Sequence, residues 1–395
     1  MAPQLELSIL SENPRAGEAM RPILADFEWK QQVHVNVSVI PCRHGYKEIY
    51  NFAQYSRGPD VSEVGTTWIG SLTSMNALRA YQQTEINEMG GEQTYIPEIW
   101  RSGLLPEDPS VWAIPWTVYS LLLYYRKVWL TKVGIEDPAV ALGGFSSFEN
   151  TLERLKSAGA IYPWVPHILR SSRIVHEVVS WIWGAGGELI SPHERKVGFN
   201  QEAAMEGLKA YYGLHKFIPS SLPLSGNPDE MFLKGETPLV ISGPWLALDQ
   251  LLGESILTQK VGVCKVPGTP YLGGSSLVIW RHSRQTEAAL ELVRYLTGLP
   301  VNIPFSPHAS TLPARTYTMN QLEVETELNR ILIESLAWGK SITPMRLWGM
   351  IEENLTSAFA RIWADLMDTP SLEVDFVLHK HLDSLATRLN STLAG

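Results

Sequence analysis

Cysteine is scarce in this sequence, which carries Cys42 and Cys264 far apart and in no CxxC pair. Clustered cysteines are needed for a zinc knuckle or a disulfide scaffold, so both are excluded, while a single bridge between the two stays open. Long apolar runs are also missing, since none approaches the roughly 18 residues of a membrane-spanning helix. The N-terminus at Met1 lacks the basic and apolar regions of a signal peptide. A cytoplasmic protein, or a leader replaced by Met-Ala, would each explain this.

Positive charge is in short supply as well: 32 Lys and Arg face 41 Asp and Glu, for a net charge of −9. Without a basic stripe, nucleic acid is not expected as a partner. Catalytic signatures are absent too, because the chain has no GxGxxG, GxSxG or HExxH motif. Gly339-Lys340-Ser341 fails as a phosphate loop, since Glu334 stands where the first glycine must be.

The ten histidines are scattered, and no carboxylate pair stands out as an acid/base couple. We therefore expect no metal, no cofactor and no enzymatic activity. The absence of catalytic motifs from so long a chain favours a binding protein over an enzyme.

What the chain has is length and aromatic residues. At 395 residues, 45% of them hydrophobic, it is too long for one simple core, so two lobes are the default expectation. Fourteen Trp and fourteen Tyr are many for this length. Aromatic faces stack on sugars but also fill cores, so this count favours a carbohydrate ligand only weakly.

The order of the predicted elements indicates an α/β fold. Residues 5–10 alternate apolar and polar as a strand, residues 20–27 have helical spacing, and residues 33–39 alternate again. That order implies parallel strands joined by a right-handed crossover. Pro115 lies inside a long extended run that reaches Arg126, which marks a crossing between sheets better than a central strand. Residues 273–276 are expected to precede a strand at residues 277–280, and residues 320–393 to be mostly helical.

The stretch Phe232–Leu246 combines the strongest local signals. A helix is expected to end at Gly235, an apolar strand to cover residues 239–242, and the chain to break at Gly243-Pro244 and present Trp245. An aromatic ring after a strand end lies where ligands usually bind in α/β proteins. A core tryptophan after a tight turn is the alternative.

Six stretches, in order, resemble the extracellular solute-binding proteins of ABC importers, specifically the carbohydrate class that includes maltodextrin-binding protein. They are Pro59–Val61 with Gly65–Trp68, Trp112–Lys127, Trp183–Gly187, Phe232–Trp245, Leu312–Arg315, and Pro344–Trp348 followed by Ile351-Glu352. The resemblance covers nearly the whole chain.

This resemblance implies a two-lobe, type 2 periplasmic-binding-protein-like fold, with extra C-terminal helices and crossings near Pro115 and Leu312–Arg315. The expected lobes are residues 1–115 plus 269–316, and residues 116–268 plus 317–395. A carbohydrate, expected to be an oligosaccharide, would be held between the lobes by hinge closure and delivered to the membrane permease subunits. The protein would be a monomer, extracellular or periplasmic, with or without a lipid anchor.

The resemblance also assigns candidate ligand-binding residues. Trp245 matches the stacking tryptophan after Gly-Pro, and Tyr119 falls where relatives often place a carboxylate, which is missing here. The further candidates, each with plain packing or a solvated loop as the alternative, are Asn13, Arg15, Thr67, Trp68, Trp116, His176, Gly274, Ser275 and Trp348. Gly273 and its neighbours would let backbone approach the cleft closely.

Two rival interpretations stay open. The first is a sensory or regulatory ligand-binding domain of a signalling protein, motivated by the missing leader. The second is a carbohydrate-active enzyme. A polyol, glycerophosphodiester or peptide also stays open as ligand, because the carboxylate expected at position 119 is absent.

Overall fold

A computed structural model describes residues 3–168, 171–191, 195–219, 222, 226–248, 260–302, 311–317 and 327–394. The chain divides into two compact units. Unit 1 comprises Met1–Tyr119, Leu272–Leu322 and Ser341–Gly349, and unit 2 comprises Ser120–Tyr271, Glu323–Lys340 and Met350–Gly395. The first crossing therefore falls at Tyr119 and not at Pro115, and unit 1 also takes a short segment, residues 341–349, from the region expected in the second lobe.

A seven-stranded sheet forms the centre of unit 1, in the order β12-β5-β11-β3-β1-β2, with β4 paired to β11. β1 pairs in parallel with both β2 and β3, as the β-α-β pattern predicts, and β11 is antiparallel to β3. The strands are β1 (Gln4–Leu10), β2 (His34–Ile40), β3 (Val61–Gly65), β4 (Leu78–Arg79), β5 (Ile114–Ser120), β11 (Leu272–Trp280) and β12 (Leu312–Pro313).

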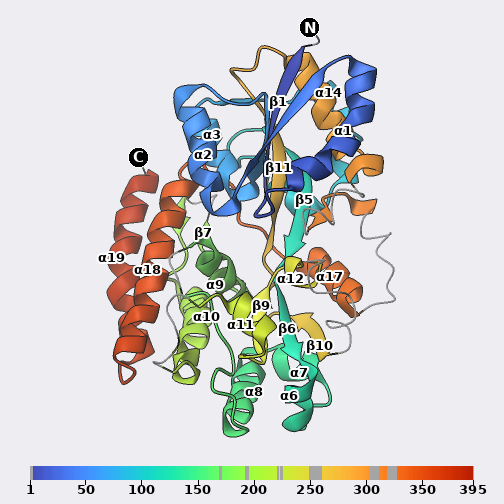
Figure 1. Ribbon diagram of the computed structural model, residues 1–395. Coiled ribbons are helices and arrows are strands. Elements are labelled where there is room, and N and C mark those ends of the chain that lie inside the picture. Colours follow the sequence, from blue (N-terminus) through green and yellow to red (C-terminus); the bar gives the residue numbers. More distant parts are fainter. Residues whose placement is uncertain are drawn as a thin grey trace. The chain divides into compact units, whose positions relative to one another are not determined.

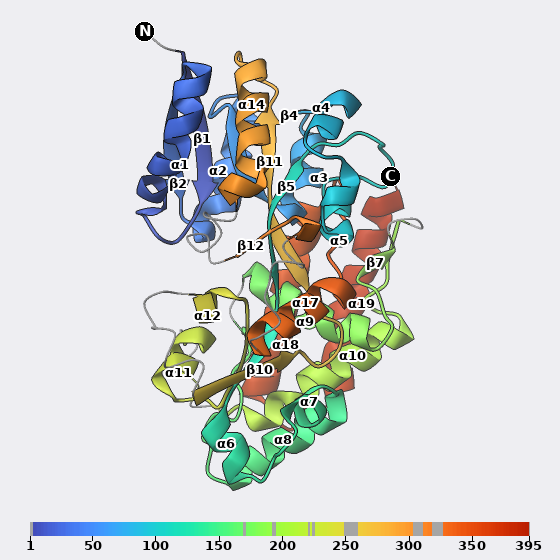
Figure 2. The same ribbon diagram turned by 90° about the vertical axis from the view of Figure 1, so that its right-hand side faces the viewer.

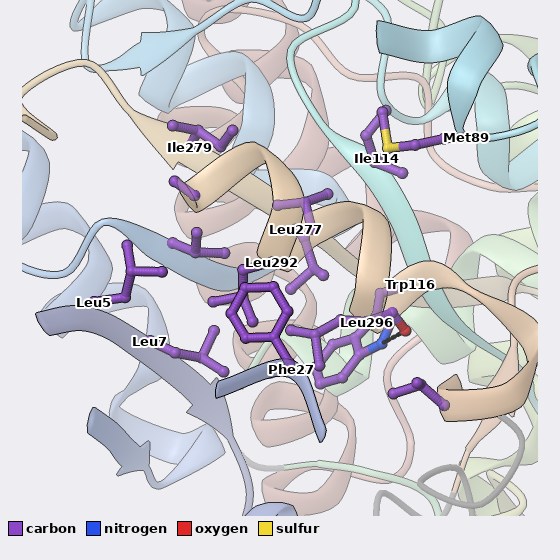
Figure 3. Close-up of a cluster of buried hydrophobic side chains, with 14 of the residues drawn as sticks. Leu5, Leu7, Phe27, Met89, Ile114, Trp116, Leu277, Ile279, Leu292 and Leu296 are labelled. Atoms are coloured by element: carbon purple, nitrogen blue, oxygen red, sulfur yellow. Dashed lines mark hydrogen bonds between the residues drawn. The ribbon is translucent and has the colours of Figure 1, made fainter. Parts of the chain in front are cut away.

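Helices cover both faces of this sheet (Figure 1). α1 (Ala16–Gln31) and α14 (Thr286–Thr297) bury their apolar faces on Leu5 and Leu7 of β1, and α2 (Cys42–Tyr55) and α3 (Ile69–Ser74) pack on the other side around Val64. The first of these cores also holds Trp116 (Figure 3). The shorter helices of unit 1 are η1 (Thr66–Trp68), α4 (Gln83–Glu88), η2 (Glu92–Thr94) and α5 (Pro97–Arg101).

Unit 2 has its own three-stranded antiparallel sheet, in the order β10-β6-β9, and a two-stranded ribbon of β7 and β8. β6 continues the extended run that begins as β5, so one stretch of chain feeds both sheets, as the sequence predicts. The strands are β6 (Leu122–Arg126), β7 (Ile190–Ser191), β8 (Lys196–Val197), β9 (Leu239–Ser242) and β10 (Val261–Lys265).

Most of unit 2 is helical. α17 and α7 both pack against β10 (Figure 2), and α18 and α19 run side by side, with α19 also against α10 (Figure 1). The helices are α6 (Lys127–Lys132), α7 (Pro138–Leu142), α8 (Phe145–Ser157), α9 (Ser172–Gly184), α10 (Glu202–Tyr212), η3 (Gly213–Phe217), α11 (Pro228–Lys234), α12 (Trp245–Leu248), α17 (Glu327–Trp338), α18 (Trp348–Asp368) and α19 (Val374–Ala394). No helix in the described part of the chain is both long and apolar enough to cross a bilayer.

The abundance of aromatic residues is largely a property of the cores. In unit 2, Tyr211 contacts Trp164, Trp181 and Trp363 edge-on, with ring centroids 5.3–5.8 Å apart. The tryptophans with less than 2% of their surface exposed are Trp116, Trp164, Trp181, Trp280, Trp348 and Trp363. Their number in the sequence is therefore mainly a packing feature.

Two local expectations need correction. Gly273–Ser276 does not precede the strand, because these residues lie inside β11. Leu312–Arg315 is not a crossing, because β12 pairs with β5 within unit 1. Both cysteines are free, Cys42 exposed and Cys264 buried, so the bridge left open by the sequence does not form.

Candidate functional site

In unit 2, Trp245 follows β9 as predicted, and its environment is built by the turn before it. A Cβ atom at Gly243 would lie 2.1 Å from the Trp245 ring, so only glycine lets the indole fold back over the turn. The buried Tyr124 hydroxyl donates to the Gly243 carbonyl at 3.0 Å. Burial, with a smaller effect of the Asp229 charge, raises the pKa of Tyr124, which keeps this donor protonated. The turn is therefore fixed from both sides, with Trp245 half-buried.

Two charged side chains hold the Trp245 ring in place. Its Nε1 donates to Oδ2 of Asp229 at 3.1 Å, and the Arg173 guanidinium lies 5.2 Å from the ring centroid. Arg173 also approaches the same carboxylate oxygen at 3.5 Å. The other oxygen, Asp229 Oδ1, is buried without a hydrogen-bond partner among the described residues. An unpaired buried acceptor costs about 1–3 kcal/mol, so a ligand hydroxyl that reached it would bind favourably.

The sequence pattern does not single out Asp229. This residue is the second of α11, the helix capped by Gly235, and nothing in the local pattern links it to Trp245. The Asn227-Pro228 start of that helix was the available signal, but it specifies a helix cap and not a neighbour of an indole.

In unit 1, several predicted residues meet where β5 and β11 pair. The Tyr119 ring covers Gly273, where a Cβ atom would lie 2.3 Å from Cζ of the tyrosine. Gly274 is equally tight, because its Cβ would lie 2.2 Å from the Thr117 carbonyl oxygen. The Ser275 and Thr117 hydroxyl oxygens are 2.8 Å apart. The two glycines are therefore required because β5 packs closely against β11 within unit 1.

Thr67 and Trp68 lie beside this cluster. Ser275 pairs in register with Gly65, directly before η1. Thr67 is buried, and the half-buried Trp68 packs over Gly65 and meets Tyr46 of α2 edge-on, with centroids 5.6 Å apart. Much of the Trp68 indole thus covers its own unit.

Trp116 and Trp348 lie in the interior, each 1% exposed. Trp116 Nε1 donates to the Leu296 carbonyl at 3.2 Å, within the core shown in Figure 3. The structure therefore favours packing over ligand contact for both residues, because neither ring is accessible to a ligand in this arrangement.

His176, Asn13 and Arg15 have separate surroundings. His176 stacks on Tyr271 with centroids 4.3 Å apart, and its Nε2 lies 3.5 Å from Oε1 of Glu352, all within unit 2. Asn13 and Arg15 are exposed in the loop after β1, where Asn13 Oδ1 accepts from the Arg15 amide at 2.9 Å. His176 is thus placed against Tyr271 and Glu352 in unit 2, and Asn13 and Arg15 lie on an exposed loop of unit 1.

Glu63 of β3 is a second residue that the sequence analysis missed. Its side chain is buried, and burial raises the pKa of Glu63 to about 7, against the opposing effect of hydrogen bonds from Ser275 and the Leu10 amide. In the sequence it is one polar residue in the short apolar step 61–64, which reads as an ordinary strand.

This carboxyl predicts how stability depends on pH. Because its pKa is raised from 4.5 to about 7, the folded chain keeps a proton that the unfolded chain releases. Stability should therefore fall as pH rises from about 4.5 to about 7, by on the order of 3 kcal/mol, and then level off. Denaturation of the wild type and Glu63→Gln across this range isolates the effect. Parallel profiles for the two proteins would contradict it.

Comparison with known proteins identifies the family to which this chain belongs. A family model for bacterial extracellular solute-binding proteins matches residues 11–301, and the chain belongs to this family. A probable ABC transporter-binding protein of Deinococcus radiodurans is 24% identical over 217 residues, 51% of this chain and 52% of that protein. The maltodextrin-binding protein MdxE of Bacillus subtilis is 24% identical over 298 residues, 70% of this chain and 66% of that protein. The matches thus span about half to two thirds of these curated relatives.

A solved structure gives the same fold over the full length. The solute-binding protein of an ABC transporter from Thermotoga lettingae, bound with α-D-tagatose, superposes with a TM-score of 0.83 at 19% identity, covering 99% of this chain and 100% of that one. The fold is that of type 2 periplasmic binding proteins, as predicted. Family and fold are those of substrate-binding proteins and not of enzymes.

Proposed function

We propose that this protein is a carbohydrate receptor that delivers its ligand to the permease of an ABC importer. The observation that carries the proposal is the half-buried Trp245 ring, held at the end of β9 by Asp229 and Arg173. A fixed aromatic face stacks on the C–H surface of a sugar ring, and a carboxylate beside it accepts hydrogen bonds from the hydroxyls. Asp229 would supply the acid that the sequence lacks at position 119.

For unit 1, we propose Tyr119, Gly274, Ser275, Thr67 and Trp68 as the ligand-facing residues, with Asn13 and Arg15 on the neighbouring loop. The ligand is a sugar, with an oligosaccharide favoured, because the Bacillus subtilis relative is named for maltodextrin. The chain does no bond chemistry. It acts as a monomer outside the cytoplasmic membrane, and its partner is the membrane permease.

A thermal-shift screen tests this function. The panel should hold α-D-tagatose, maltose, maltotriose and longer oligosaccharides, with a polyol, a glycerophosphodiester and a peptide as other solute classes. A ligand at about 100 times its Kd adds about 2.7 kcal/mol of stability, which raises the midpoint of unfolding measurably. A shift with a non-sugar solute and with no sugar would contradict the carbohydrate assignment.

A further inference from the structure

Glu63 joins two strands of unit 1 at the point where they separate. In the parallel pairing of β1 with β3, Leu7 lies opposite Val61 and Ser8 lies opposite Ser62. Beyond it, the Leu10 amide donates to Oε2 of Glu63 at 2.7 Å. The Glu63 carboxylate thus replaces the backbone carbonyl that would accept from Leu10 if the two strands stayed paired. The Glu63 side chain is buried, with 7% of the residue exposed.

The same carboxyl reaches the strand on its other side. Ser275 of β11 is the diagonal neighbour of Glu63 on the same face of the sheet, because Leu277 pairs with Glu63 and Ser275 with Gly65. As a hydrogen-bond donor, its hydroxyl lowers the pKa of the Glu63 carboxyl against the effect of burial. Ser275 Oγ also lies 2.8 Å from Thr117 Oγ1 of β5. The groups that face Glu63 from β1 and β11 are therefore one amide and one hydroxyl, with the Thr117 hydroxyl behind, and none of them titrates near neutral pH. One buried acid of β3 thus links to β1 directly and, through Ser275 of β11, to β5.

The proton on this acid fixes the direction of the hydrogen bonds. An ionised carboxylate only accepts, so Ser275 must donate to it and can then only accept from Thr117. A neutral carboxyl can donate to Ser275, which frees the serine proton for Thr117. The donor and acceptor roles at Ser275, a proposed ligand-facing residue, thus follow the charge of Glu63.

We infer that Glu63 is a positioning residue for ligand binding, which holds the ends of β1 and β11 together and sets the donor role of Ser275. This inference rests on the proposed function, since it takes a ligand to cover these strand ends. A ligand that does so excludes solvent above the strand ends and lowers the polarity around an acid that is already costly to ionise, and so it binds the neutral form better. Affinity should then fall as pH rises through about 7, the value to which burial raises the pKa of Glu63.

The first part of the test needs no ligand. The Leu10 amide resonance, followed by NMR, should titrate with a midpoint near pH 7 in the wild type and stay flat in Glu63→Gln. Glu12→Gln is the matched control, because Glu12 is an exposed acid near the end of the same strand, paired with Arg43 at 2.7 Å. It should leave the Leu10 titration unchanged. A Leu10 resonance that does not titrate in the wild type overturns the inference.

The second part measures Kd by calorimetry with α-D-tagatose and maltotriose at about pH 6 and pH 8. Binding should weaken by about threefold to tenfold at the higher pH in the wild type and in Glu12→Gln, since each unit of pKa shift is worth tenfold. It should be pH-independent in Glu63→Gln. Equal pH dependence in all three proteins overturns the positioning role. If neither sugar binds, the proposed function fails on that result, while the ligand-free titration still decides on Glu63.

Discussion

Replacing Trp245 by alanine should weaken sugar binding about tenfold or more and leave the fold intact. Tenfold corresponds to about 1.4 kcal/mol, which one stacking ring can supply through its buried area and its aromatic contact. Structural damage should be small, because the ring is half-buried and lies at the end of an edge strand. Calorimetry with the sugar selected by the thermal-shift screen gives the ratio of Kd values.

Two further variants sharpen this result. Trp245→Phe keeps an aromatic face but loses the 3.1 Å bond to Asp229, so its Kd should lie between those of the wild type and Trp245→Ala. Trp338→Ala removes a tryptophan of the same unit that is 77% exposed at the end of α17, and should bind as the wild type does. An unchanged Kd in Trp245→Ala would remove this residue from the site.

Gly207→Ala should destabilise the protein by about 3 kcal/mol, although alanine normally favours a helix by about 1 kcal/mol over glycine. The reason is the contact between α10 and α9. A Cβ atom at Gly207 would lie 2.4 Å from the Trp181 carbonyl oxygen and 2.7 Å from its carbon, and this backbone cannot move without the helix that carries it. Thermal unfolding followed by circular dichroism should show a lower midpoint.

Gly213→Ala is the matched control for this variant. Gly213 comes directly after α10 and has a helical φ of −58°, and a Cβ atom added there would have no neighbouring atom within 4 Å. Alanine there should be neutral or slightly stabilising. If Gly207→Ala and Gly213→Ala unfold at the same temperature, the contact between α9 and α10 is looser than the structure indicates.

Local features of the fold were predictable from the sequence. Gly235 has a φ of +82° at the end of α11, and Leu239–Ser242 forms β9, because both are decided by a few neighbouring residues. Gly273 and Gly274 lie inside a strand and not before it for the opposite reason. Two consecutive glycines suggest the start of a strand locally, but here β5 packs so closely against them that only glycine fits within the strand.

The candidate site was predictable only in part. Trp245 follows a recognisable strand and turn, whereas Asp229 and Glu63 owe their roles to residues far along the chain. The Leu10 amide is 53 positions from Glu63, and the Trp245 indole is 16 positions from Asp229. Trp116 shows the remaining difficulty, since a tryptophan suits a core and a sugar equally well until its burial is known.

The sheet of unit 1 has a consequence for the order in which the chain can fold. β11 lies between β3 and β5, yet it begins at Leu272, after Ser120–Tyr271, the longest segment of unit 2, has been made. During synthesis, β3 and β5 therefore keep unpaired edges until β11, their common partner strand, has been translated. Unit 1 therefore cannot be completed first in the usual N-to-C order, because its sheet needs a strand that follows a long segment of the other unit.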